Sequence, residues 1–196
     1  MKIRFILVAI ALFLLITACG APKTVVKEDT TSQVLNDNSR NTIKKTPLQT
    51  SFLGIKFGDS HSLVSRKLSR FRPRRDKDGA ISVYDQSFGG YNWNLLKVFF
   101  VDNKLYSVNF QNPFSKEASA KERYDSICKM LRTKYGELEL TNSGNGYQYA
   151  DSDHNLVIIS VYQGLSKGGQ EYWYCELSYF WGAGLIVEYV KTLDEI

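Results

Sequence analysis

The predicted order of helices and strands repeats once along the chain, and this order limits the folds open to it. Residues 59–110 are predicted as one helix followed by three strands, and residues 116–180 repeat that order. Strand runs joined by tight turns, with a helix opening each set, are typical of α+β domains. The sequence therefore predicts one α+β domain over residues 51–196. It would consist of two helix-plus-antiparallel-strand halves, with the helices packed on one face of the sheet.

Hydrophobic periodicity supports these assignments. Apolar residues spaced three or four apart predict helices over residues 60–70 and 116–135, with Ser115 as the cap of the second. Alternating runs rich in β-branched and aromatic residues predict strands at 81–84, 94–101, 104–110, 147–150, 156–162 and 171–180. The pair Asp102-Asn103 predicts a tight turn between the second and third strands.

The segment Leu53-Gly54-Ile55-Lys56-Phe57-Gly58, followed by a capped helix, is similar to the start of a known helix-then-sheet unit. This unit belongs to the β-lactamase inhibitory protein family and to the small bacterial lipoproteins of outer-membrane assembly. The resemblance is one of element order and covers most of residues 51–180. It implies a binding module that uses a sheet face and has no catalytic centre. No inhibitory residue of that family can be matched to a position in this chain.

The N-terminus has the pattern of a secretory signal. Lys2 and Arg4 precede an unbroken apolar run over residues 5–16, and small residues lead from there to Cys19. As a helix this run would rise only about 18 Å, which is short of the ~30 Å hydrocarbon core of a bilayer. We therefore expect a signal peptide over residues 1–18.

Ile16-Thr17-Ala18-Cys19 resembles the lipobox of bacterial lipoproteins. The resemblance implies diacylglycerol on the Cys19 thiol, cleavage before Cys19 and usually a third acyl chain on the new amine. Two or three acyl chains hold a protein at a membrane. The residue after the cysteine is Gly20 and not aspartate, and in this the chain resembles the lipoproteins that are sorted to the outer membrane. The expected location is the cell envelope, and an ordinary cleaved signal or an uncleaved anchor is the alternative.

Residues 19–50 contain the lipidated cysteine followed by a polar segment. That segment has too few large apolar groups to offset the entropy of ordering it, and it predicts a flexible tether. The net charge of +5 comes mostly from the signal and the tether, because residues 51–196 hold 18 basic and 17 acidic side chains. The basic balance is therefore no argument for nucleic acid, and no nucleic-acid partner is expected.

Two motifs suggest chemistry, but both are better interpreted as turns. Residues 164–168 match the G-x-S-x-G of serine hydrolases, yet a strand follows where that fold has a helix, and both histidines precede Ser166. Residues 151–155 open like a calcium loop but lack its glycine and its glutamate. No catalytic residue, metal or cofactor is expected, and a serine hydrolase acting through Ser166 is the alternative from another class.

Two cysteines besides Cys19 form a candidate disulfide. Cys128 lies on the apolar stripe of the second helix, and Cys175 lies on the more apolar face of the last strand. Both are therefore expected between helix and sheet, in a compartment that permits disulfides. A bridge would close a loop of about 48 residues and add roughly 3–4 kcal/mol. Two buried free thiols are the alternative.

One short segment concentrates positive charge. Seven basic residues fall within twelve positions and are offset only by Asp76. They are Arg66, Lys67, Arg70, Arg72, Arg74, Arg75 and Lys77. Such a cluster gains roughly 1 kcal/mol per basic residue close to an anionic membrane. It predicts docking to lipid phosphate, lipopolysaccharide or an acidic partner, and a solvated helix end is the alternative.

Aromatic residues are too numerous in the strands to be buried by two helices alone. Tyr172 and Tyr174 are predicted on the strand face opposite Cys175, and Tyr147 and Tyr149 complete the candidate partner site. Tyrosine contributes contact area at low entropic cost, which suits recognition surfaces. Coverage of this face by the end of the chain or by the tether is the alternative.

Taken together, these features predict a lipid-anchored binding protein of the cell envelope. It would have no catalytic centre and would recognise another envelope protein or a polymer through the tyrosine-rich sheet face. A purely architectural role at the membrane surface, through the basic segment, is the alternative.

Overall fold

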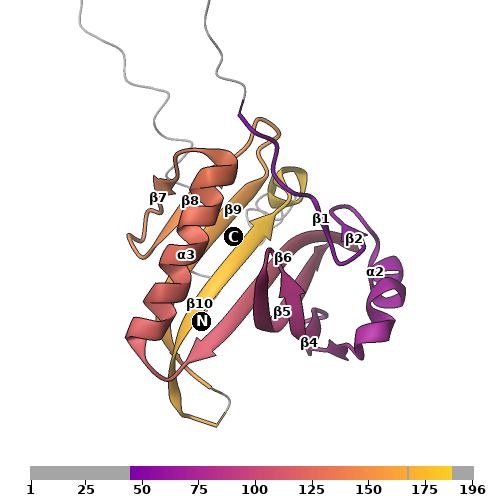
Figure 1. Ribbon diagram of the computed structural model, residues 1–196. Coiled ribbons are helices and arrows are strands. Elements are labelled where there is room, and N and C mark those ends of the chain that lie inside the picture. Colours follow the sequence, from indigo (N-terminus) through magenta and orange to yellow (C-terminus); the bar gives the residue numbers. More distant parts are fainter. Residues whose placement is uncertain (1–44, 167, 187–196) are drawn as a thin grey trace, which may run out of the picture. The chain divides into compact units, whose positions relative to one another are not determined.

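The structure is a computed structural model that describes residues 45–166 and 168–186, and the chain from Lys45 onward forms a unit of its own. Its helical elements are α2 (His61–Leu68), the 3₁₀ turn η1 (Ser69–Phe71) and α3 (Glu117–Tyr135) (Figure 1). Its strands are β1 (Ser51–Phe52), β2 (Ile55–Lys56), β3 (Arg74–Arg75), β4 (Ile81–Phe88), β5 (Tyr91–Val101), β6 (Lys104–Phe114), β7 (Glu139–Leu140), β8 (Gly146–Ala150), β9 (Leu156–Leu165) and β10 (Glu171–Phe180).

Eight of these strands form one antiparallel sheet in the order β3-β4-β5-β6-β10-β9-β8-β7, while β1 and β2 form a separate hairpin. The first and second halves of the chain meet where β6 pairs with β10. The predicted Asp102-Asn103 turn is confirmed. Both residues have positive φ angles, 48° and 60°, as expected for a two-residue hairpin turn.

The predicted α+β fold class, with helices packed on one face of the sheet, is wrong. The described chain is mostly β and is dominated by the eight-stranded sheet. Most strands are longer than predicted, because β5 and β6 have 11 residues each and β9 has 10, whereas β10 has the predicted bounds. In addition, α2 has only eight residues and buries just Val64 and Leu68, which is too little to cover a half-sheet.

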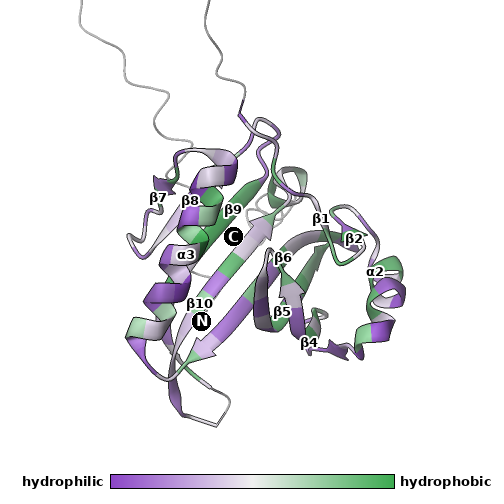
Figure 2. Cartoon of the chain, in the orientation of Figure 1, coloured by the Kyte–Doolittle hydropathy of each residue, from purple (hydrophilic) through white to green (hydrophobic). Residues whose placement is uncertain are grey.

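The main core lies between the sheet, α3 and the β1–β2 hairpin. The helix α3 packs on β9, β10 and β6, and Figure 2 shows apolar residues along β9 behind it. It buries Ala120, Ile127, Cys128, Leu131 and Tyr135. The hairpin adds Phe52, whose ring centroid lies 5.0 Å from that of Tyr179 and 5.6 Å from that of Phe88.

The folded unit starts before the predicted boundary at Ser51. The Leu48 side chain is only 6% exposed, and its N–H donates to Asp151 Oδ2 at 2.9 Å. The Tyr149 hydroxyl donates to the Thr46 carbonyl, also at 2.9 Å. Residues 45–50, which the sequence assigned to the tether, therefore form a strap fastened to the folded unit.

The two helices begin differently. The Ser60 hydroxyl accepts a hydrogen bond from the Leu63 N–H at 3.3 Å and caps α2. The cap residue of α3 is Lys116, which makes no side-chain capping bond, so the predicted cap at Ser115 is wrong. No helix among the described residues is long and apolar enough to cross a bilayer. The predicted signal peptide over residues 1–18, the predicted lipidation site Cys19 and residues 20–44 lie outside the described residues.

Candidate binding face

Strand alternation separates the side chains of β10 between two faces of the sheet. Cys175 and Tyr179 point toward α3, whereas Tyr172, Tyr174 and Glu176 point to the opposite side. The neighbouring strands β9 and β6 add residues to that opposite side, because Tyr162 pairs with Tyr174 and Gln111 with Glu176. We call this surface the tyrosine face; it comprises Asn109, Gln111, Tyr162, Tyr172, Tyr174 and Glu176.

A hydrogen-bonded network centred on Glu176 fixes the middle of the tyrosine face. Its Oε2 accepts from the Tyr162 hydroxyl at 2.8 Å and from Gln111 Nε2 at 2.9 Å. Its Oε1 accepts from the Ser178 hydroxyl at 3.0 Å and from Asn109 Nδ2 at 3.4 Å. A carboxylate that accepts four bonds at a half-buried position orients every partner around it.

The Tyr162 hydroxyl makes two hydrogen bonds. It donates to Glu176 and accepts from Gln111 Nε2 at 2.6 Å. Burial raises the pKa of Tyr162 well above its usual range, and the negative charge of Glu176 raises it further. Tyr162 therefore stays a neutral phenol and is not poised to act as a base.

The three tyrosines of this face contact one another in a row. The Tyr162 and Tyr174 rings stack with centroids 5.5 Å apart, and the Tyr172 ring follows at 6.4 Å from Tyr174. Gly164 stands opposite Tyr172, and a Cβ atom there would come within 3.3 Å of the Tyr174 ring. The glycine therefore leaves room for Tyr174 to lie across β9. The result is a half-exposed aromatic row beside a rigid polar network.

The same sheet face continues to β5, where Lys97 pairs with Asn109 in the strand register. Its ammonium group lies 3.0 Å from Asp76 and 3.2 Å from Asp78. Burial lowers the pKa of Lys97, but the hydrogen bonds to the two carboxylates outweigh this and leave the pKa above its usual value. Lys97 is therefore neutralised locally and is not available as a free cation.

The structure does not bring all four predicted partner-binding tyrosines together. Tyr147 and Tyr149 lie on the face of β8 that packs against α3. Tyr149 is 7% exposed and stacks on Tyr135 at 5.2 Å. Tyr147 stacks on Tyr124 at 6.3 Å. Only Tyr172 and Tyr174 of the predicted set belong to the tyrosine face.

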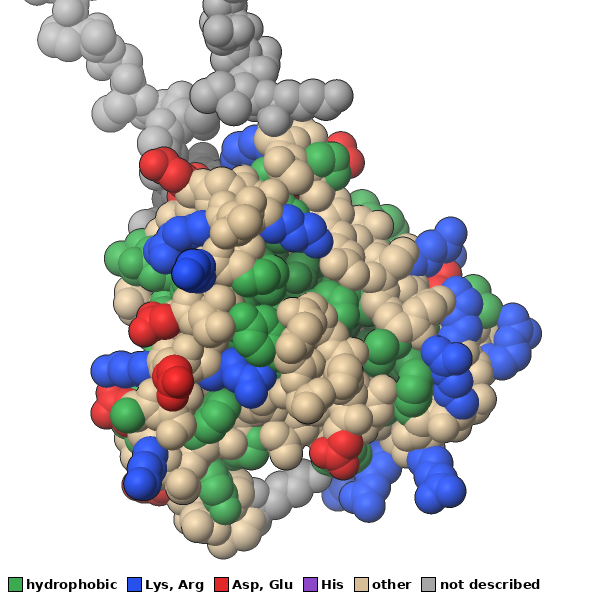
Figure 3. Space-filling view, viewed as in Figure 1, with side chains coloured by type: hydrophobic (Ala, Val, Ile, Leu, Met, Phe, Trp, Pro, Cys, Tyr) green, Lys and Arg blue, Asp and Glu red, His purple; other side chains and the backbone are tan. Residues whose placement is uncertain are grey.

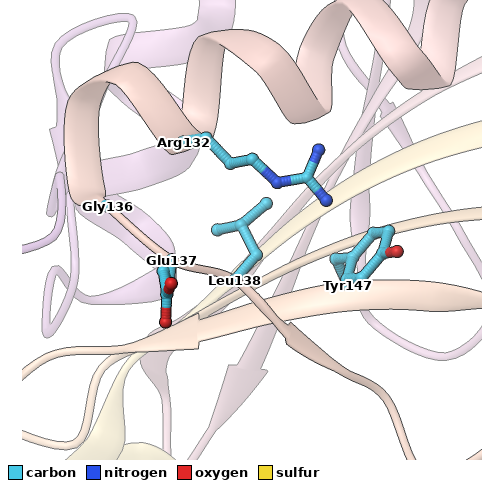
Figure 4. A pocket seen from close by; sticks show the side chains of 5 residues that line it. All are labelled: Arg132, Gly136, Glu137, Leu138 and Tyr147. Carbon is cyan, nitrogen blue, oxygen red and sulfur yellow. The ribbon is translucent and has the colours of Figure 1, made fainter.

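A groove at the C-terminal end of α3 includes Tyr147 (Figure 4). It is lined by Arg132, Gly136, Glu137, Leu138 and Tyr147. Figure 4 shows the Arg132 side chain extending from α3 toward Tyr147, and the guanidinium lies 4.8 Å from the centre of that ring. The Arg132 guanidinium is thus already engaged by the Tyr147 ring.

Cys128 and Cys175 occupy the predicted place between helix and sheet, and both are buried free thiols in the structure. They lie close enough for the charge of one to affect the other. Burial raises the pKa of Cys175 to about 12. Burial also raises the pKa of Cys128, although a hydrogen bond with Tyr124 opposes this shift. Neither thiol is an activated nucleophile.

The two catalytic and calcium-like motifs form turns. The Ser166 hydroxyl accepts from the Gln170 N–H at 3.1 Å, inside the connection between β9 and β10. Asp151 is buried and accepts from the backbone N–H groups of Leu48, Asp153 and Asn155, all at 2.9 Å. Ser166 is therefore not exposed on a strand-to-helix elbow, and Asp151 is occupied by structural bonds.

Within residues 45–166 and 168–186, no group of three or more His, Cys, Asp and Glu side chains is placed to hold a metal ion. Comparisons with protein-family models, with curated proteins and with solved structures found no match to this chain. The role of the tyrosine face must therefore be inferred from its geometry.

Sequence reasoning placed Tyr172 and Tyr174 on one face but missed Gln111 and Asn109. Both amides alternate with apolar residues in β6, which is the signal of a polar strand face. That signal becomes informative only once β6 is known to pair with β10.

Proposed function

We propose that this protein is a lipid-anchored binding protein of the cell envelope. It would be held at a membrane by acylated Cys19 and would recognise another envelope protein through the tyrosine face. The observation that carries this proposal is the row of half-exposed tyrosines, Tyr162, Tyr174 and Tyr172, beside the fixed Glu176 network. Tyrosine anchors next to oriented polar groups are typical of protein recognition sites.

A protein partner fits this face better than a polymer of sugars. Tyr162 and Tyr174 already cover one ring face of each other. Glu176, Gln111 and Asn109 offer hydrogen-bonding groups in fixed positions, which match the polar rim of a protein interface. A catalytic function is not part of the proposal, because Ser166 is bonded within its turn and Tyr162 is a neutral phenol.

The double variant Tyr172→Ala and Tyr174→Ala tests the binding site. A photo-crosslinking residue at position 172 would first identify the partner in the native envelope by mass spectrometry, and binding to the purified partner would then be measured. Loss of two interface tyrosines is expected to weaken binding by about 30-fold or more.

Leu140→Ala is the matched control, because Leu140 is 58% exposed and pairs with Tyr147, on the side of the sheet that faces α3. It should bind as the unchanged protein does. Equal binding by the double variant would refute the tyrosine face as the site. If purified glycan strands bind and no protein is crosslinked at position 172, the partner is a polymer and not a protein.

Cys19→Ser tests whether acylated Cys19 anchors the protein to a membrane. Without a thiol to acylate, the variant is expected to leave the membrane fraction after a high-salt wash, whereas the unchanged protein should stay. A processed Cys19→Ser protein that remains with washed membranes would show that the assigned anchor is wrong.

A further inference from the structure

The seven basic residues of segment 66–77 gather at one end of the sheet. They belong to the last turn of α2, to η1, and to β3 and its neighbours, and β3 is the edge strand next to β4. Figure 3 shows Lys and Arg side chains collected over the part of the molecule that holds α2 and β4 in Figure 1. The sequence cluster is therefore also a cluster in space.

The fold uses one of the seven basic groups for its own stability. Lys67 Nζ lies 2.8 Å from Asp59 Oδ2, and the Asp59 side chain is only 4% exposed. The remaining six side chains are exposed, and none of them forms an ion pair with a residue that the structure describes; they are Arg66, Arg70, Arg72, Arg74, Arg75 and Lys77.

The acidic groups nearest in sequence do not neutralise this cluster. Asp76 and Asp78 both pair with Lys97 of β5 rather than with an arginine of the segment. Asp76 also accepts a hydrogen bond from the Ser82 hydroxyl at 3.0 Å. The six exposed cations therefore form a patch whose nearest carboxylates in sequence pair with Lys97 instead.

Two of the guanidinium groups lie over aromatic rings. The Arg70 group lies 4.6 Å from the centre of the Phe71 ring, and the Arg74 group lies 5.5 Å from that of Tyr84. Arg72 adopts a left-handed backbone conformation, with φ of 52°, between η1 and β3. Stacked arginines keep their N–H donors at the ring edges, where they can bind phosphate oxygens in pairs.

We propose that these six residues form a docking surface for a bilayer with anionic phosphate head groups. Phosphates at a membrane surface are spaced densely enough to meet several cations at once, and each basic residue near such a surface contributes roughly 1 kcal/mol. The choice of a membrane over another polyanion rests on the proposed acyl anchor, which holds the domain beside the bilayer. The charge geometry itself does not depend on that anchor.

Vesicle co-sedimentation of residues 45–196 tests the proposal without the anchor, because this part of the chain is a unit with its own core. Vesicles of phosphatidylglycerol and phosphatidylethanolamine would be compared with phosphatidylcholine vesicles. Binding to the anionic vesicles alone is expected, and it should fall steeply as salt is added, since exposed charges are screened. The variant Arg72→Glu, Arg74→Glu and Arg75→Glu should lose at least tenfold in bound fraction.

Lys116→Glu, Lys129→Glu and Lys134→Glu provide the matched control, because they reverse three exposed charges around α3 and change the net charge equally. This control should keep most of the binding, with folding of both variants checked by circular dichroism. Equal losses in both variants would show attraction by net charge alone and overturn the docking surface. Equal pelleting with both lipids, or binding to heparin without vesicle binding, would also overturn it. None of these outcomes depends on Cys19 or on the tyrosine face.

Discussion

At the scale of single residues, burial determines how the two cysteines behave. The pKa of Cys175 is about 12 in the folded chain, against a usual value of 9.0. Below pH 9.0 both folded and unfolded chains keep the thiol proton, so this group has no effect on stability there. Between pH 9.0 and about 12 the unfolded thiol ionises while the folded one does not. The free energy of unfolding should therefore fall as pH rises through this range, by up to about 1.4 kcal/mol per pH unit.

Urea unfolding at several pH values measures this slope, and Cys175→Ala should make it shallower. A slope that Cys175→Ala leaves unchanged would contradict the assignment to this thiol. A thiol count on the unfolded, unreduced chain from Lys45 serves as the control. Two reactive thiols are expected from the structure, whereas a Cys128–Cys175 disulfide would leave none.

The sequence predicted which residues share a side within one strand. It did not predict whether the tyrosines of two different strands lie on the same face of the sheet. Tyr172 and Tyr174 alternate correctly with Cys175 in β10, as the sequence indicated. Tyr147 and Tyr149 alternate just as regularly in β8, yet the register Tyr147 to Ile159 turns them toward α3. Alternation within one strand carries no information about this register, so grouping the four tyrosines exceeded what the pattern could show.

At the scale of elements, the two helix starts predict opposite effects of substitution. Ser60→Ala removes the bond to the Leu63 N–H and should cost about 1 kcal/mol of stability. Lys116 occupies the cap position of α3 in an extended conformation, with φ of −123° and ψ of 137°, and supplies no capping bond. Lys116→Asp should therefore stabilise the protein by about 0.5–1 kcal/mol, through a cap and a favourable charge at the helix start.

Thermal and urea unfolding of both variants would measure these effects. Arg66→Ala and Glu122→Ala serve as controls within the same helices, because both side chains are exposed. A stabilising Ser60→Ala or a destabilising Lys116→Asp would contradict the assigned helix starts.

Element positions were predicted more accurately than their assembly. The predicted helices over 60–70 and 116–135 correspond to α2 with η1 and to α3, and each predicted strand lies within an observed strand. The pairing of β6 with β10 joins Phe114 to Trp173 across the whole second helix. Such a pairing leaves no local pattern, so the sequence predicted two halves in one domain but not which strands join them. The Glu176 network depends on the same pairing and was missed for the same reason.

At the scale of the whole molecule, the strap should be a measurable part of the fold. A chain that starts at Ser51 instead of Lys45 lacks the buried Leu48 side chain and the bonds to Asp151 and Tyr149. Burial of one leucine is worth about 1.5–3 kcal/mol, and each hydrogen bond about 1 kcal/mol. The shorter chain should therefore be less stable by about 3.5–5 kcal/mol.

Leu48→Ala in the longer chain separates the side chain from the backbone bonds and should show an intermediate loss, measured by urea unfolding. Gln49→Ala is the control, because Gln49 is only half-buried and makes its described bonds at the surface. Equal stability of the two chain lengths would mean that residues 45–50 act as tether after all.

The strap also determines which bonds bear a pulling force applied to the chain at Lys45. A pull on the chain at Lys45 reaches the Thr46 bond to Tyr149 and the Leu48 bond to Asp151 before it reaches β1. Tyr149 lies on β8 and Asp151 lies in the turn from β8 to β9, so the force acts first on the second half of the sheet. A force applied to the chain before residue 45 would therefore load these two bonds near the edge of the sheet before it loads the β1–β2 hairpin.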